Sequence, residues 1–234
     1  MLFRSLVFLA LLTSQQIMAS VLVKGHQWPQ NSQLNVVFLD GSIEVKALVK
    51  TYSILWIKNT NLSFHFFDAL DSAPQETHIR ISFKNHSGSQ LGNQKNLLSK
   101  EPTMNLFDLI SDQISNAGAK RLILHEFGHA LGIEHEYRNP NWPYGQFAMA
   151  EIMKVCLPKM MFIGYSKEGA QTQCLFINTK LKTESVLSTA YDEISIMNYA
   201  LSFKDKNDFI VNIEGQSELS YLDLYAFQKW YPKN

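Results

Sequence analysis

The chain has 234 residues, of which 46% are hydrophobic, 18% charged and 12% aromatic, and its 21 basic side chains balance its 21 acidic ones. This apolar content is ample for a packed core and excludes wholesale disorder, and the length fits one domain or two small lobes that share a cleft. The zero net charge argues against a nucleic-acid-binding protein, which normally carries a basic excess.

Residues 1–19 have the layout of a secretory signal peptide. Arg4 lies in a short basic start, an apolar run follows it, and a polar stretch ends at Ala19. This layout predicts export with cleavage after Ala19 or Ser20. An uncleaved anchor or a buried N-terminal helix are the alternatives, but the apolar run is shorter than the roughly 20 residues that span a bilayer. We therefore expect a secreted or periplasmic protein without stable membrane association, with 20–234 as a single domain.

The first half of this domain, about 20–132, predicts alternating strands and helices. Apolar and β-branched residues cluster or alternate in four segments that we expect to be strands: 34–39, 62–67, 78–83 and 103–106. Apolar residues at helical intervals predict an amphipathic helix over 43–58. A second helix is predicted over 119–131, beginning after Gly118 and ending at Gly132. The order indicates a helix lying across a small twisted sheet.

The second half, about 133–234, is less regular in its pattern. We expect a helix over about 147–156 and then a loop-rich stretch to Thr189. A final helix is predicted to end near Trp230, with Asp223 at the position of the acid in a capping box.

Two cysteines, Cys156 and Cys174, are present in the chain. An even number in an exported protein favours a disulfide, and two cysteines permit one intramolecular pairing. Two buried free thiols are the alternative.

The segment H-E-F-G-H, which begins at His125, carries the strongest chemical signal. On a helix, His125 and His129 project from the same face, one turn apart. Two neutral imidazoles at this spacing can bind one Zn²⁺ at about 2.0–2.1 Å each. Glu126 follows the first histidine, which places its carboxylate beside the metal rather than on it.

The residues that follow this helix predict a third ligand. Gly132 can turn the chain out of the helix, and His135 can then fold back toward the metal. Three protein ligands leave an open position for water, as a catalytic zinc site requires. The remaining histidines lack such spacing and are assigned no role: His26, His65, His78 and His86.

These motifs resemble those of the metzincins, whose signature is H-E-x-x-H-x-x-G-x-x-H followed by a methionine turn. The turn here is S-I-M-N-Y over 195–199. Among metzincins, the chain is most similar to the astacin family, which carries Glu directly after the third His, as Glu136 does. The astacin turn reads S-x-M-H-Y, so that Asn198 replaces a histidine. The preceding Tyr191-Asp192 and the final helix that ends in Trp-Tyr are similar too.

The chain also departs from the astacin pattern. Astacins commonly continue H-E-x-x-R-P-D-R, whereas here Pro140 keeps its offset, Arg138 is one residue early and Asn141 replaces the aspartate. The single cysteine pair differs from the usual two bridges. No pro-segment is evident before the first strand.

The resemblance implies an α+β, metzincin-like zincin fold. It would have an N-terminal twisted mixed sheet with two long helices, the active-site helix at the cleft floor, and an irregular C-terminal subdomain that ends in a helix. It also implies a secreted zinc metalloendopeptidase with one catalytic Zn²⁺, which acts as a monomer on a protein or peptide substrate. His125, His129 and His135 would be the metal ligands.

The resemblance and general zinc chemistry assign the remaining roles. Zinc lowers the pKa of its bound water toward 7 and polarises the scissile carbonyl. Glu126 would accept the proton of this water and later donate it to the leaving amine. Tyr199 matches the astacin tyrosine that can ligate the metal and swing away to bind the oxyanion, and a packing tyrosine is the alternative. Met197 would form an apolar floor beneath the metal.

Two further questions remain open from the sequence. The segment 85–92 is either a sheet edge that binds an extended peptide by strand addition or an ordinary polar loop. The whole chain is alternatively a zinc-bound but inactive peptide-binding module, or a highly selective peptidase of another metzincin branch. The intact Glu126 argues against the inactive module, because such a module needs no general base.

Overall fold

The structure, a computed structural model, describes residues 20–93, 96–162, 164–187 and 190–233, and the expected signal peptide lies outside these ranges. The helices are α1 (Ile43–Ile57), α2 (Asn116–Ala130), α3 (Met149–Phe162), α4 (Lys167–Asn178) and α5 (Tyr221–Trp230). The strands are β1 (Val21–Leu22), β2 (Gln33–Phe38), β3 (Ser63–Phe67), β4 (Ile79–Ser82), β5 (Gly88–Ser89), β6 (Met104–Asn105), β7 (Ile133–Glu134), β8 (Leu201–Lys204) and β9 (Ile210–Ile213). Short 3-10 helices are η1 (Leu70–Ser72), η2 (Phe107–Ile110), η3 (Glu136–Arg138), η4 (Gly145–Ala148) and η5 (Thr183–Ser185).

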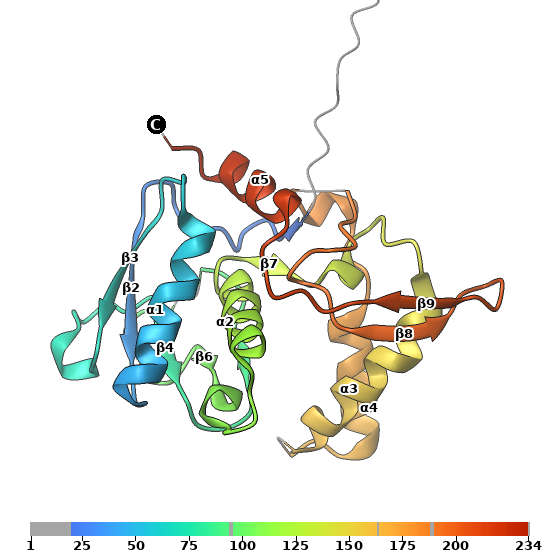
Figure 1. Ribbon diagram of the computed structural model, residues 1–234, viewed down its shortest axis with the longest axis horizontal. Helices are drawn as coiled ribbons and strands as arrows, with labels where there is room; N and C mark the ends of the chain where they lie inside the picture. The colour runs from blue at the N-terminus through green and yellow to red at the C-terminus, as the bar shows by residue number, and fades with distance from the viewer. Residues whose placement is uncertain (1–19, 94–95, 163, 188–189, 234) are drawn as a thin grey trace, which may run out of the picture.

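Five strands form a mixed sheet in the order β3-β2-β4-β6-β5, which confirms the predicted N-terminal sheet. The first four strands of this order run parallel, and β5 joins the edge antiparallel to β6. Figure 1 shows α1 and α2 on one side of the picture with this sheet, and α3, α4, β8 and β9 on the other. We refer to the sheet with α1 and α2 as the N-terminal lobe, and to α3, α4, β8 and β9 as the C-terminal lobe.

The core of the N-terminal lobe lies between the sheet and its two helices, and α5 closes one end of it. Trp56 of α1 and Phe127 of α2 are fully buried there, together with Phe227 of α5. The indole Nε1 of Trp56 donates a hydrogen bond to the carbonyl oxygen of Leu124 at 2.8 Å, which fixes α1 against α2. The active-site helix is therefore held on several sides by apolar contacts.

The predicted start of α2 was wrong by three residues. The helix begins at Asn116 rather than after Gly118, because the side chain of Ser115 accepts a hydrogen bond from the Gly118 N–H and caps it. A glycine inside the first turn costs less than this cap contributes.

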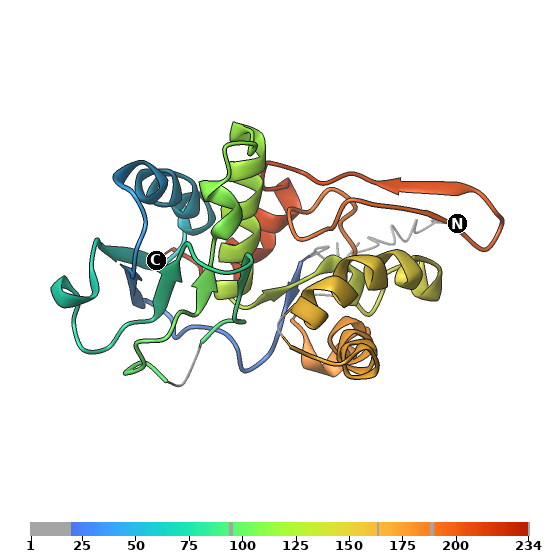
Figure 2. The same cartoon turned by 90° about the horizontal axis from the view of Figure 1, so that it is seen from below.

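The prediction for the C-terminal lobe was wrong in two places. Helix α3 does not end at Cys156 but continues through Pro158 to Phe162, and α4 replaces most of the expected loop. Ser166 caps α4, and the buried residues of α4 recur at every fourth position: Ala170, Cys174 and Asn178. The two helices lie side by side in both views and are joined by the predicted disulfide between Cys156 and Cys174 (Figures 1 and 2).

The final helix, α5, confirms the predicted capping box. Ser220 accepts from the Asp223 N–H, and the Asp223 carboxylate accepts from the Ser220 N–H. Within the described ranges, no helix is both long and apolar enough to cross a membrane.

Candidate metal centre

Helix α2 holds the first two predicted metal ligands in a buried position. His125 and His129 lie one turn apart in its last two turns, and both side chains are buried. Their ring centroids are 4.9 Å apart, so the two rings share one face of the helix. The packing of α2 in the N-terminal core thus fixes the spacing of these ligands before any metal binds.

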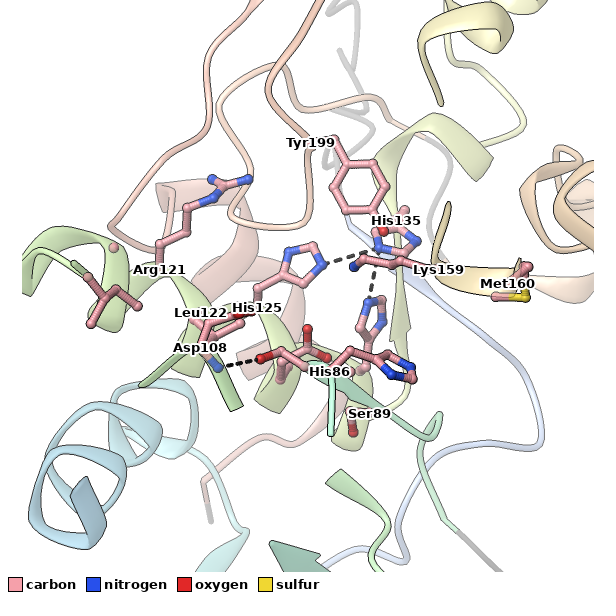
Figure 3. A pocket seen from close by; sticks show the side chains of 16 residues that line it. His86, Ser89, Asp108, Arg121, Leu122, His125, His135, Lys159, Met160 and Tyr199 are labelled. Atoms are coloured by element: carbon pink, nitrogen blue, oxygen red, sulfur yellow. Dashed lines mark hydrogen bonds between the residues drawn. The ribbon is translucent and has the colours of Figure 1, made fainter. Parts of the chain in front are cut away.

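Gly132 turns the chain so that the third histidine meets the first two. Its φ angle is +95°, and a Cβ atom here would lie 2.9 Å from the backbone oxygen of His26. Strand β7 then pairs antiparallel with β1, and His135 follows it. The Nε2 atom of His135 lies 3.2 Å from that of His125 and 3.1 Å from that of His129. Figure 3 shows His125 and His135 pointing toward each other.

The hydrogen bonds of the first two ligands leave their converging nitrogens without a proton. His125 Nδ1 lies 2.9 Å from the Ile196 carbonyl oxygen, and His129 Nδ1 lies 2.8 Å from that of Ile133. A carbonyl oxygen only accepts, so Nδ1 is protonated and Nε2 keeps a lone pair in both rings. Lone pairs aimed at one point repel each other unless a cation lies between them.

The distances between these nitrogens fit a zinc ion. The ligand atoms of the three histidines all lie within 4.8 Å of one another. Tetrahedral zinc, with nitrogens at 2.0–2.1 Å, separates its ligands by about 3.3 Å, which is close to the distances found here. The residues present therefore match the metal that the sequence predicts.

Burial sets the protonation of the groups around this site. Burial, more than the neighbouring His129, lowers the pKa of His125 and His135 well below that of a free imidazole. The same desolvation raises the pKa of Glu126 and of Tyr199. His125 and His135 are thus kept in the neutral form that binds metals.

A cavity of about 480 Å³ opens in front of the histidines, and Glu126 lines it. The carboxylate is buried, and its Oε2 atom has no hydrogen-bond partner among the described residues. A buried polar atom of this kind is costly unless a water, ion or ligand meets it. Glu126 therefore brings a carboxylate oxygen without a partner to the wall of the cavity that the histidines line.

The methionine turn lies directly under α2. A Cβ atom on Gly128 would lie 2.4 Å from the sulfur of Met197, so only glycine lets the fully buried Met197 approach the helix this closely. The ring of Tyr199, two residues further on, lies 5.8 Å from the ring of His125 and 4.6 Å from that of His135. The turn therefore places an apolar side chain below the site and a phenol beside it.

Asp223 of α5 holds this turn from behind. Its carboxylate accepts hydrogen bonds from the Ser195 hydroxyl at 2.7 Å and from the Ile196 N–H at 3.0 Å. The sequence indicated Asp223 as a helix cap but gave no sign of this second role. Because Ile196 in turn accepts from the first histidine ligand, α5 supports the site indirectly.

The structure brings all the predicted site residues to one cavity: His125, Glu126, His129, His135 and Tyr199. It adds two residues that the sequence did not identify, His86 and Lys159, which line the cavity from the two lobes (Figure 3). A histidine without a spaced partner gives no sequence signal, and Lys159 lies in the part of α3 that was expected to be a loop. The other three histidines do not line this cavity: His26, His65 and His78.

No protein-family profile matches the sequence, and no curated protein matches it significantly. Two solved structures of myroilysin are similar to it at 27% sequence identity. The first has a TM-score of 0.70, and the match covers 92% of this chain and 99% of the myroilysin chain. The second has a TM-score of 0.64, and the match covers 90% of this chain and 87% of the myroilysin chain. High choriolytic enzyme 1, a hatching enzyme zinc-protease from the medaka fish Oryzias latipes, has a TM-score of 0.51 at 18% identity and covers 88% of this chain and 94% of that chain. These likenesses confirm the predicted astacin-like metzincin fold.

Proposed function

We propose that this chain, with its astacin-like metzincin fold, is a zinc-dependent metalloendopeptidase whose catalytic unit is 20–234. One observation carries the proposal: the Nε2 atoms of three histidines converge on one point, at least two of them without a proton, and a buried carboxylate oxygen without a partner lies in the wall of the same cavity. Similar solved structures support the same activity, because one of them is named a zinc-protease.

In this proposal each residue of the site has a distinct task. His125, His129 and His135 hold the zinc, which when bound supplies Lewis-acid activation of water and of the substrate carbonyl. Glu126, which lines the cavity, takes a proton from the attacking water and later gives it to the leaving amine. Tyr199 donates its phenolic proton to the oxyanion, and its burial favours the protonated form that this needs.

The substrate is an extended peptide that adds to the sheet at β5. This strand is the last of the five in the sheet and lines the cavity through Gly88 and Ser89, so its outer edge faces the place where a peptide would lie. The antiparallel pairing of β5 with β6 favours a strand over the ordinary polar loop that was the alternative for this segment. We propose that the enzyme acts on protein or peptide substrates as a monomer.

Two features support export and removal of 1–19. The disulfide fits an oxidising compartment. Ser20 is fully buried, and its hydroxyl donates to Asp223 at 3.0 Å. Cleavage after Ala19 would place an ammonium group on Ser20, next to Asp223, a buried acid that no described salt bridge neutralises. The mass of the exported protein would test this cleavage.

The activity is tested by cleavage of unfolded casein, with the zinc content of each sample measured. Wild type is compared with Glu126→Gln, and Glu218→Gln serves as a matched control because this acid is exposed and does not line the cavity. We expect cleavage by wild type and Glu218→Gln alone, with one zinc per chain in all three. Zinc in all three without cleavage of casein or of a peptide library would indicate a peptide-binding module instead.

A further inference from the structure

The three histidines differ in what holds the ring nitrogen that faces away from the metal. The Nδ1 atoms of His125 and His129 bond to backbone carbonyl oxygens, as described above. The Nδ1 atom of His135 instead lies 2.9 Å from the hydroxyl oxygen of Tyr137. The third ligand is therefore the one whose orientation depends on another side chain.

Tyr137 is itself held by helix α4. Its hydroxyl bonds to Oδ1 of Asn178, the last residue of α4, and the Nδ2 of Asn178 donates to the carbonyl oxygen of Cys174 at 2.7 Å. The bond to Cys174 identifies which amide atom is the nitrogen, because a carbonyl oxygen accepts only. The Oδ1 atom of Asn178 must then accept from Tyr137.

These bonds permit one arrangement of protons. Since Tyr137 gives its only proton to Asn178, its oxygen accepts from the Nδ1–H of His135. The Nε2 atom of His135 is consequently left with a lone pair toward the metal. The chain of bonds from Cys174 to His135 thus selects the metal-binding tautomer of the third ligand.

Packing fixes the side chains that make these hydrogen bonds. Tyr137 is 2% exposed and Asn178 is 3% exposed, so water does not compete for their hydrogen bonds. The ring of Tyr137 stacks on that of His135, with centroids 4.8 Å apart and planes 14° apart. Cys174 is also the residue that the disulfide ties to Cys156 of α3. We call the hydrogen bonds that run from Cys174 through Asn178 and Tyr137 to His135 the relay. The relay therefore ends at a covalent cross-link of the C-terminal lobe.

We propose that Tyr137 and Asn178 are positioning residues for His135, and that the disulfide supports metal binding by holding the helix that carries Asn178. This inference rests on the proposed function, because it requires that the histidines bind zinc. It adds that helices α3 and α4, which carry none of the three ligands, set the affinity for the ion.

The test is the zinc dissociation constant of the full mature chain, measured by competition with a chelator. We expect Tyr137→Phe and Asn178→Leu to bind zinc about 10- to 100-fold more weakly than wild type. The double variant should be no weaker than Tyr137→Phe, because both changes break one relay. Cys156→Ala/Cys174→Ala should weaken binding by a smaller factor, about 3- to 10-fold. Tyr144→Phe is the matched control, since it removes a hydroxyl from the same aromatic cluster without touching a ligand.

Two further readouts separate positioning from simple loss of structure. The melting temperature of metal-free Tyr137→Phe should stay near that of wild type, while the visible spectrum of the cobalt(II)-loaded protein should change in Tyr137→Phe and not in Tyr144→Phe. If the variants do not fold, nitrogen NMR of the zinc-loaded wild type still tests the relay, which requires a slowly exchanging proton on Nδ1 of His135.

The outcomes distinguish this inference from the proposed function. Wild-type affinity in both Tyr137→Phe and Asn178→Leu, or an unprotonated Nδ1, would overturn the relay and leave the protease intact. A wild type that binds zinc through the relay but cleaves nothing would overturn the protease alone. A folded wild type that binds no zinc would overturn both.

Discussion

The two lobes support the metal centre by different physical means. The N-terminal lobe carries two ligands and the proposed general base on a helix that is packed into a large apolar core. The C-terminal lobe has a smaller core, leaves Phe162 77% exposed and Phe176 74% exposed, and relies on a disulfide and buried polar contacts. One site can thus combine histidines that are fixed by hydrophobic packing with a histidine that is fixed by hydrogen bonds.

The largest effect on activity should follow from removing a histidine that the N-terminal lobe carries on α2. We expect His129→Ala to lose all measurable cleavage of casein and stoichiometric zinc, because two nitrogens bind the ion far more weakly than three. The apolar core is untouched, so the far-ultraviolet circular dichroism should match that of wild type. Unfolding of this variant would show instead that zinc holds the N-terminal lobe together.

A pair of phenylalanine truncations compares the two cores directly. Phe127→Ala removes a fully buried ring from the N-terminal core and should cost about 3–5 kcal/mol of unfolding free energy. Phe203→Ala removes a ring that is 6% exposed from the smaller C-terminal cluster and should cost about 1.5–3 kcal/mol. Denaturant unfolding measures both, and equal costs would contradict the difference between the lobes.

The disulfide should contribute a comparable free energy of unfolding to the stability of the C-terminal lobe. It closes a loop with a sequence separation of 18 residues, for which loop entropy predicts about 3 kcal/mol. Cys156→Ala/Cys174→Ala should therefore lower the denaturation midpoint. Hydrogen exchange should locate the loosening in α3 and α4, and faster exchange in the central sheet would contradict the account.

The smallest effect concerns the pH dependence of the N-terminal lobe. The Asn35 N–H donates to Nδ1 of His78 at 2.9 Å, and burial lowers the pKa of His78, with Glu76 opposing and Arg80 adding to the shift. The unfolded chain then binds this proton more readily than the folded chain, so wild type loses stability as the pH falls below about 6.5. His78→Gln should remove this contribution, so its unfolding free energy should fall less between pH 7 and pH 5 than that of wild type. Parallel curves for the two proteins would show that His78 does not contribute.

The sequence predicts most of what is local and misses what depends on distant contacts. The spacing of His125, His129 and His135 is a property of one helix and one turn, so their convergence on one point was predictable. Helix α4 was missed because its apolar face is short and polar residues surround it, although Ser166 offered a cap signal. The bond between Tyr137 and Asn178 joins residues 41 positions apart, and no spacing rule connects them.

Stepwise addition of zinc to the metal-free wild-type chain, with casein cleavage measured at each step, tests whether the protein is a zinc protease. We expect activity to rise in proportion to zinc and to stop rising at one ion per chain. Activity that does not depend on zinc, or a correctly folded chain that takes up no zinc, would contradict this expectation.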